Sequence, residues 1–181
     1  MKKLFAISAL AVALLSLSTA CEKESTWDTY KEWRETNDAF LSEQALLKNE
    51  DGSPFYSKLT PSWYPSSGVL IHYFNDRSLT EGNLTPLVTS TVSVKYKGWM
   101  CNDYAFDSSY TAVDSLFTFR PTETIVGWQI ALTDMNVGDS ARVVIPWAEG
   151  YGTESSGAIL PFSTLVFDIK LVDVVAYETS N

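Results

Sequence analysis

The sequence contains little of the chemistry on which most enzymes depend. It has one histidine, His72, and only two cysteines among 181 residues. A histidine-centred catalytic triad, or a zinc site with several histidine ligands, is hard to build from a single histidine. Basic residues are also scarce, since 13 Lys and Arg stand against 22 Asp and Glu and give a net charge of −9. An acidic chain repels phosphate backbones, which argues against a nucleic-acid partner.

The sequence also lacks an N-terminal apolar run long enough for a comfortable transmembrane helix. The apolar stretch Leu4–Leu17 follows two lysines and precedes small residues that lead into Cys21. This arrangement predicts a signal peptide over residues 1–20. It resembles the signal of bacterial lipoproteins, in which the cysteine after the cleavage site is diacylated, although Ser18 stands where leucine is usual. The alternative is ordinary cleavage, with Cys21 as a free thiol or disulfide partner.

Diacylation of Cys21 would anchor the protein in a lipid bilayer, because each buried methylene contributes about 0.8 kcal/mol and two acyl chains suffice. We therefore expect a lipid-anchored protein of a bacterial cell envelope, facing the periplasm or the cell surface. With Cys21 acylated, Cys101 has no intramolecular partner. We expect Cys101 to be a reduced, packed thiol.

Apolar and aromatic residues, by contrast, are plentiful. Hydrophobic residues make up 45% and charged residues 19% of the chain, which is typical of a globular protein and not of a disordered one. Aromatic residues reach 13%. This excess indicates a large apolar core, an aromatic-lined pocket, or both.

An amphipathic helix is predicted over residues 26–47, ahead of the main domain. Its core-facing positions recur at spacings of three and four, at Trp27, Tyr30, Trp33, Asn37, Phe40, Leu41, Ala45 and Leu47. The helix either packs on its own domain or serves as a dimerising arm, so a monomer and a homodimer both stay open. Residues 52–68 are rich in Ser, Pro and Tyr and predict an irregular connector. Residues 21–68 thus comprise a tether, this helix and the connector.

Strand patterns dominate the remainder, which we assign to one domain over residues 69–181. Alternating or short apolar segments occur at Val69–Phe74, Leu87–Met100, Phe117–Phe119, Arg142–Pro146 and Thr164–Val175. One short helix is predicted over Ile125–Leu132. An antiparallel sheet wrapped around one helix is the α+β solution to this pattern.

A series of short motifs runs through this domain. In order, they are Val92–Gly98 (VSVKYKG), Phe106–Ser109 (FDSS), Ile125–Trp128 (IVGW), Met135–Gly138 (MNVG), Val144–Pro146 (VIP), Tyr151-Gly152 and Ile159–Phe167. Each motif alone is a weak signal, but the ordered series resembles the FKBP-type peptidyl-prolyl cis-trans isomerases. The resemblance implies an FKBP-like antiparallel β-sheet wrapped around one short helix.

The aromatic residues of these motifs could, taken singly, be ordinary core. The resemblance instead places them around a shallow apolar cup with Trp128 as its floor. It implies catalytic roles for Tyr96, Phe106, Asp107, Ile125, Trp128, Tyr151 and Phe167. It further implies substrate-binding roles for Phe117, Thr124 and Ile159.

Within this set the resemblance divides the roles by chemistry. The aromatic rings hold the prolyl ring, while the Ile125 N–H and the Tyr151 hydroxyl donate hydrogen bonds to substrate carbonyls. Asp107 lies at the lip of the cup, where it accepts a hydrogen bond, or it only stabilises its loop. Rotation about an Xaa-Pro amide breaks no bond, so we expect no metal and no cofactor.

The expected function is isomerisation of Xaa-Pro bonds in exported proteins, which assists their folding. Expected partners are proline-containing polypeptides and macrolide-type inhibitors. One alternative is an FKBP-like binding or chaperone module with little isomerase activity, and another is a structural lipoprotein. The departures from the family pattern, such as Thr124, Leu160 and Tyr110, affect the rim of the cup. They bear on substrate preference and inhibitor affinity more than on the basic activity.

Overall fold

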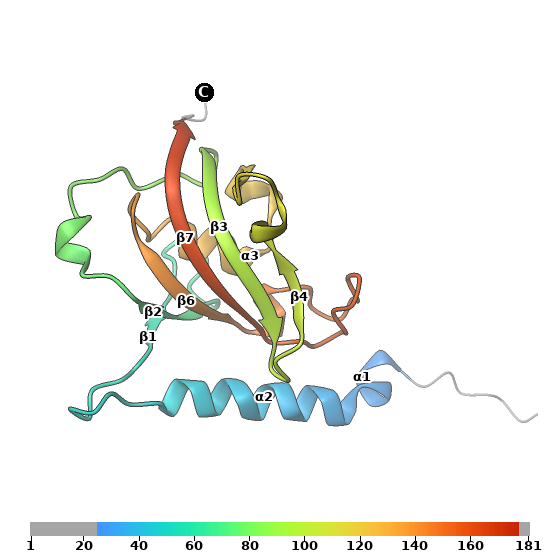
Figure 1. Ribbon diagram of the computed structural model, residues 1–181. Helices are drawn as coiled ribbons and strands as arrows, with labels where there is room; N and C mark the ends of the chain where they lie inside the picture. Colours follow the sequence, from blue (N-terminus) through green and yellow to red (C-terminus); the bar gives the residue numbers. More distant parts are fainter. Residues whose placement is uncertain (1–24, 178–181) are drawn as a thin grey trace, which may run out of the picture.

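Seven strands form one antiparallel sheet in the computed structural model, which describes residues 25–177. The strand order is β1-β2-β6-β7-β3-β4, and β5 also pairs with β3 (Figure 1). The strands are β1 (Ser57–Leu59), β2 (Val69–Tyr73), β3 (Thr91–Met100), β4 (Ala105–Ser108), β5 (Phe117–Phe119), β6 (Ser140–Ile145) and β7 (Leu165–Ala176). The expected signal peptide over residues 1–20 and the expected lipidation site Cys21 lie outside the described residues.

Helices are few in the described part of the chain, and only one of them exceeds two turns. They are α1 (Thr26–Thr29), α2 (Lys31–Leu46) and α3 (Val126–Leu132), with single 3-10 turns η1 (Arg77–Leu79), η2 (Ser109–Thr111), η3 (Pro121–Glu123) and η4 (Trp147–Glu149). None of these helices has both the length and the apolar character needed to cross a membrane. The sheet with its central helix α3 and its N-terminal helix confirms the predicted α+β architecture.

The long strands β3 and β7 form the spine of the sheet. They pair from Thr91 with Ala176 to Met100 with Leu165, and β6 pairs with the other edge of β7. Alternation along β3 buries Val92, Val94 and Tyr96 on the face that meets α3. The core of the protein therefore lies between this face of the sheet and the helix.

Helix α3 fills the hollow of the sheet because nearly all of its side chains are apolar. Trp128, Ile130 and Leu132 are buried in the main core cluster. Gly127 allows the close approach, because a Cβ at this position would lie 2.4 Å from Cγ2 of Ile145 on β6. The helix is thus fixed against the sheet at its first turn, which also borders the candidate site.

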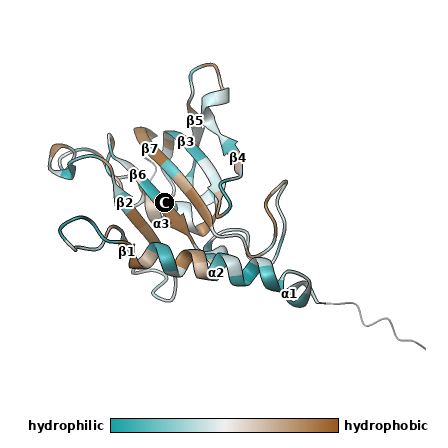
Figure 2. Cartoon of the chain, turned by 60° about the horizontal axis from the view of Figure 1, so that its bottom comes forward, coloured by the Kyte–Doolittle hydropathy of each residue, from teal (hydrophilic) through white to brown (hydrophobic). Residues whose placement is uncertain are grey.

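Helix α2 crosses the end of the sheet where β3 ends and β7 begins (Figure 1). Asn37 is fully buried there, and its Oδ1 accepts a 2.7 Å hydrogen bond from the backbone N–H of Thr164. The indole of Trp33 donates to the hydroxyl of Ser163 at 3.1 Å. Figure 2 shows the hydrophobic residues of α2 towards its C-terminal half, where Phe40 packs against a second apolar cluster. The amphipathic helix is therefore packed on its own domain.

The predicted helix over residues 26–47 is divided at Tyr30, whose backbone angles (φ −103°, ψ 21°) end α1. Ser25 caps α1 by accepting a hydrogen bond from the N–H of Asp28. The guanidinium of Arg34 lies 3.4 Å from the Trp27 ring centroid and donates to the Trp27 carbonyl at 2.7 Å. These contacts hold α1 against the first turns of α2 across the break.

The prediction of an irregular connector over residues 52–68 is wrong in one respect. Residues Ser57–Leu59 form β1, which pairs with β2 from Ser57 opposite Ile71 to Leu59 opposite Val69. This edge strand has three residues and is largely exposed, so its sequence lacks the alternation of apolar residues that would predict a strand. The sheet therefore begins before residue 69, within the segment assigned to the connector.

His72 and Cys101 lie away from the candidate site. His72 stacks on Phe55 with ring centroids 3.8 Å apart, and its Nδ1 lies 2.7 Å from the Phe55 carbonyl oxygen. Cys101 is a free thiol of intermediate exposure, and burial raises its pKa above the ordinary value. His72 is therefore held by packing against Phe55. The raised pKa of Cys101 disfavours the reactive thiolate form.

Candidate active site

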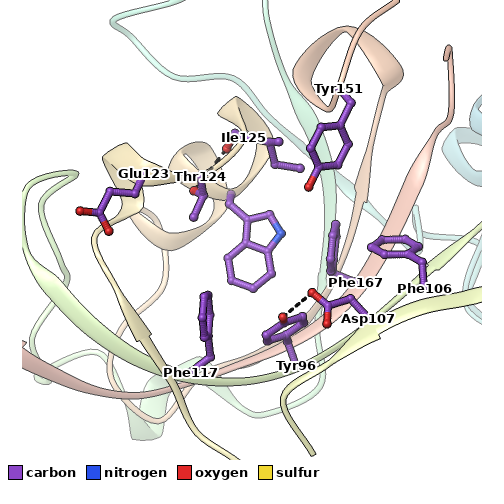
Figure 3. Close-up of a pocket in the computed structure, with 10 residues that line it drawn as sticks. Tyr96, Phe106, Asp107, Phe117, Glu123, Thr124, Ile125, Tyr151 and Phe167 are labelled. Carbon is purple, nitrogen blue, oxygen red and sulfur yellow. Dashed lines mark hydrogen bonds between the residues drawn. The ribbon is translucent and has the colours of Figure 1, made fainter. Parts of the chain in front are cut away.

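A pocket of about 400 Å³ opens at the start of α3, between the helix and strands β3, β4 and β5. Figure 3 shows most of the lining side chains directed into it, whereas the carboxylate of Glu123 points outward at the rim. The lining residues are Tyr96, Phe106, Asp107, Phe117, Glu123, Thr124, Ile125, Trp128, Tyr151 and Phe167. The volume suits a ring and its flanking peptide units, and it falls in the range typical of small-molecule sites.

The lining residues come from strands and turns that the sheet brings together. Tyr96 lies on β3, between its partner strands β4 and β7. Phe106 and Asp107 come from β4, and Phe167 comes from β7, opposite Gly98. Because these strands are hydrogen-bonded neighbours, the pocket wall is as rigid as the sheet.

Trp128 forms the floor of the pocket. It is 4% exposed and belongs to the core cluster, yet its ring also borders the pocket. Tyr96 and Phe167 meet it edge-to-face, each with ring centroids 5.1 Å apart, and Phe119 meets it at 5.5 Å. Edge-to-face pairs contribute about 0.5–1.5 kcal/mol each beyond their area burial, so the floor is held in one orientation.

Gly98 on β3 leaves room for two walls of the pocket. A Cβ at this position would lie 2.6 Å from Cε1 of Phe167 and 2.9 Å from Cζ of Phe106. These two rings themselves pack edge-to-face at 5.5 Å. Glycine is therefore required here for packing, and it sets how deeply both rings sit.

The hydroxyl of Tyr96 donates a 2.5 Å hydrogen bond to Oδ2 of Asp107 (Figure 3). The other oxygen of Asp107 accepts a 2.7 Å bond from the N–H of Ser108. Burial and the neighbouring Asp107 raise the pKa of Tyr96 well above its ordinary value. The Tyr96 phenol therefore stays protonated and orients the carboxylate at the lip of the pocket.

The opposite rim is formed by the turn that leads into α3. Ile125 is the N-cap residue, at the end of the helix where backbone N–H groups lack partners within the helix. The hydroxyl of Thr124 donates to the Pro121 carbonyl at 2.7 Å, and the Thr124 carbonyl accepts from Gln129 at 2.9 Å. These bonds fix the turn that carries Ile125, a residue that lines the pocket.

Tyr151 lies just after η4 and is 39% exposed. Its hydroxyl is directed towards the interior of the pocket in Figure 3. A phenol in this position can donate a hydrogen bond to a carbonyl that enters the pocket. The site therefore combines an apolar floor with a small number of polar groups at its edge.

The structure brings together all but one of the residues that the sequence assigned to the site. The exception is Ile159, which is 4% exposed, belongs to the core cluster and does not line the pocket. A tight turn explains its position, since Ser156 and Ile159 exchange backbone hydrogen bonds of 2.9 Å around Gly157. Glu123 lines the pocket but was missed. Its place directly before the predicted substrate-binding residue Thr124 was the available signal.

The chemistry of the lining is that of a binding pocket for a neutral, apolar group. Among residues 25–177, no group of three or more His, Cys, Asp or Glu side chains could hold a metal ion. The lining holds phenols and carboxylates but no cysteine, histidine or lysine. An antiparallel sheet around one helix, with an aromatic-lined pocket at the start of that helix, defines the class of this domain.

Comparison with known proteins identifies this class more narrowly. Residues 82–172 match the FKBP-type peptidyl-prolyl cis-trans isomerase family, which is half of the chain. The protein therefore belongs to the FKBP-type peptidyl-prolyl cis-trans isomerase family.

Among curated relatives, the FKBP-type peptidyl-prolyl cis-trans isomerase FkpA of Buchnera aphidicola is 35% identical over 136 residues. This alignment covers 75% of the present chain and 52% of that relative. FkpA of Escherichia coli is 40% identical over 89 residues, which cover 49% of the chain and 33% of the relative. The chain thus spans from about a third to about half the length of these relatives.

Solved structures give the same fold. A peptidyl-prolyl cis-trans isomerase of Pseudomonas syringae superposes with a TM-score of 0.62 at 26% identity, covering 80% of this chain and 94% of that one. FkpA of Escherichia coli superposes with a TM-score of 0.65 at 28% identity, covering 83% and 64% of the two chains. Each superposition covers at least 80% of this chain, whereas the family match covers residues 82–172, which are half of it. The structural similarity therefore extends beyond the residues of the family match.

Proposed function

We propose that this protein catalyses cis-trans isomerisation of Xaa-Pro bonds in proline-containing polypeptides. The observation that supports it best is the pocket in which Tyr96, Phe106 and Phe167 surround the floor formed by Trp128. The pocket is apolar where a prolyl ring would rest and polar only at its rim. Membership of the isomerase family supports the same activity.

The chemistry of the reaction explains why such a pocket suffices. The barrier to rotation about a peptide bond is about 18–20 kcal/mol, and the uncatalysed step takes about tens to hundreds of seconds. In the transition state the amide is twisted and has lost its conjugation, so its carbonyl carries less charge than in the planar form. An apolar site that binds the twisted form more tightly than either planar form accelerates the rotation.

Some of the named residues hold the prolyl ring, and others form hydrogen bonds that stabilise the twisted amide. The prolyl ring packs on the Trp128 indole, which its edge-to-face neighbours keep in place. The Ile125 N–H and the Tyr151 hydroxyl donate to substrate carbonyls on either side of the prolyl ring. Asp107, oriented by Tyr96, accepts a hydrogen bond at the lip. Each 1.36 kcal/mol of preference for the twisted form raises the rate tenfold.

The cellular setting follows from the N-terminal sequence. We propose that Cys21 is diacylated and that the protein works at a bacterial cell envelope, on the periplasmic or outer side, on exported clients. Relatives from Escherichia coli and Buchnera are bacterial proteins of the same family. Incorporation of a radiolabelled fatty acid into the wild-type chain, and its loss in Cys21→Ser, tests the anchor.

We propose further that the protein is a monomer and that macrolide-type FKBP inhibitors occupy its pocket. The buried Asn37 and the partly buried Trp33 of α2 pack against their own domain, which supports the monomer because that face is already covered. Light scattering of the chain from residue 22 onwards measures its mass, and a dimer would contradict this part. Competitive inhibition of peptide isomerisation by a macrolide tests whether such inhibitors bind in the pocket.

A protease-free assay on a short Xaa-Pro peptide tests the activity. We expect wild type to accelerate the exchange well above buffer, and Phe167→Ala and Tyr151→Phe to lower kcat/KM about tenfold or more. Tyr104→Phe is a matched control, because Tyr104 is 51% exposed and does not line the pocket. A wild type that is no faster than buffer, or variants as fast as wild type, would overturn the proposal.

A further inference from the structure

The mouth of the pocket carries charge of one sign. Two of its lining residues, Asp107 and Glu123, are carboxylates, and none is basic. They lie on opposite sides of the pocket in Figure 3. A polypeptide that places a proline in the pocket therefore runs its neighbouring side chains past negative charge.

The two carboxylates differ in how far they are already engaged. Both oxygens of Asp107 accept hydrogen bonds, from the Tyr96 hydroxyl and from the N–H of Ser108. The exposed Glu123 accepts one long bond of 3.3 Å at Oε2, from the backbone N–H of Arg120. Glu123 thus keeps most of its capacity to meet a charged group from outside.

The segments that flank the lining residues in the chain carry charges of both signs. Asp114 lies three residues before Phe117, and Glu154 three residues after Tyr151, and both acids are exposed. Among nearby cations, Lys97 is directed to the Tyr110 ring, with its Nζ 5.1 Å from the centroid. Arg120 precedes the η3 turn, and its side chain does not line the pocket.

We propose that Glu123 makes this site selective for Xaa-Pro segments that carry a lysine or arginine beside the proline. The inference rests on the proposed isomerase function and adds a substrate class to it. A cation next to the proline gains attraction from Glu123, whereas an acidic residue in the same place is repelled. A neutral residue is the reference between them. The effect acts on association and on the bound state alike, because the charge on Glu123 does not change during the rotation.

Three peptides that differ only at the residue before proline test the inference, with Lys, Leu or Glu at that position. Exposed ion pairs contribute about 0.2–1 kcal/mol, so we expect kcat/KM for the Lys peptide to exceed that for the Glu peptide by about fivefold. The measurement uses a protease-free assay at low ionic strength, where the Debye length is about 30 Å. Raising the salt to about 1 M, where that length is about 3 Å, should bring the ratio towards one.

Variants assign the preference to Glu123. We expect Glu123→Gln, which keeps an oxygen acceptor for the Arg120 N–H, to reduce the Lys-to-Glu ratio to below about twofold. Glu123→Lys should invert the ratio, which tests the inference even if one variant folds poorly. Glu43→Gln is the matched control, because it removes the same charge from an exposed position on α2 outside the pocket lining. It should leave the wild-type ratio unchanged.

The outcomes separate this inference from the function on which it rests. Turnover of the Leu peptide with equal rates for the Lys and Glu peptides overturns the selectivity and leaves the isomerase proposal standing. A wild-type preference that Glu123→Gln and Glu123→Lys do not alter also overturns it, since another charge would then be responsible. No turnover of any peptide by wild type overturns both.

Discussion

Tyr96 and Asp107 form one hydrogen-bonded unit across the lip of the aromatic pocket. They lie eleven residues apart, on the paired strands β3 and β4, and the phenol donates to Oδ2 at 2.5 Å. Each therefore fixes the other: the carboxylate holds the ring of Tyr96 against Trp128, and the phenol aims the carboxylate. The rim of the pocket is thus set by a side-chain pair and not only by the sheet.

Breaking this pair should lower activity in a non-additive way. We expect Tyr96→Phe and Asp107→Ala each to reduce kcat/KM about tenfold, because a hydrogen bond to a charged group is worth about 1.5–3 kcal/mol. The double variant should lose little more than either single one, since residues in one network couple. Peptide isomerisation rates for the four proteins measure the coupling. Losses that simply multiply would show that the two side chains act independently.

The space left by Gly98 offers a second test. We expect Gly98→Ala to push Phe167 and Phe106 from their positions, because the added Cβ would lie 2.6 Å and 2.9 Å from their ring atoms. Overpacking of this kind costs about 1–3 kcal/mol, and kcat/KM should fall with stability. Thermal unfolding and peptide turnover measure the two effects.

Gly82→Ala is the matched control for that substitution. A Cβ at Gly82 meets no atom within 4 Å, and its φ lies outside the left-handed region. We expect it to change stability by less than about 0.5 kcal/mol. If Gly98→Ala behaved like Gly82→Ala, the rings would have more freedom than the close packing indicates.

The sequence predicts the sheet well wherever a strand has one buried face. β3, β6 and β7 each show apolar positions that the structure buries against α3. The edge strand β1 escapes prediction because its three residues are mostly exposed and because it forms only through its pairing with β2, which local sequence does not encode. The break at Tyr30 escapes it for a similar reason, since the contact of Arg34 with Trp27 maintains it.

The motifs of the sequence predict most of the residues that line the pocket, but they do not predict the acidic residue Glu123 at its rim. The aromatic residues stand in motifs whose order is visible in the chain, so most of the lining was found. Glu123 lies on a 3-10 turn whose orientation depends on the hydrogen bonds of Thr124. The sequence predicts Ile159 in the pocket, but the tight turn after Ser156 directs it into the core. Turn geometry of this kind follows from long-range packing that local pattern does not contain.

Two tyrosines with raised pKa values, the buried Tyr96 and the half-buried Tyr73, make the free energy of unfolding depend on pH in the alkaline range. Burial is the first cause that raises the pKa of Tyr73 and of Tyr96 above the ordinary value of 10.0, and hydrogen bonds to Asp134 and Asp107 add to it. Above about pH 10 the unfolded chain loses protons that the folded chain keeps, so the free energy of unfolding falls as pH rises. Denaturant titrations at several pH values should show this decline.

Phenolate absorbance identifies the residues responsible. We expect part of the tyrosine absorbance change to appear only with unfolding, and that part to shrink in Tyr73→Phe and Tyr96→Phe. Well below pH 10 both phenols are protonated in the folded and unfolded states, so they should cause no change of stability with pH there. A folded protein in which every tyrosine titrates near pH 10 would contradict the prediction.

One buried amide contributes to the attachment of α2 to the sheet. Asn37 is fully buried, accepts from the Thr164 N–H at 2.7 Å and donates from Nδ2 to the Trp33 carbonyl at 2.7 Å. We expect Asn37→Ala to lower the free energy of unfolding by about 1–3 kcal/mol, because the buried Thr164 N–H loses its acceptor. Thr36→Ala is the control on the same helix: Thr36 is exposed, and its hydroxyl bonds only within α2. Denaturant unfolding measures both variants, and equal losses would show that the amide does not hold the helix to the sheet.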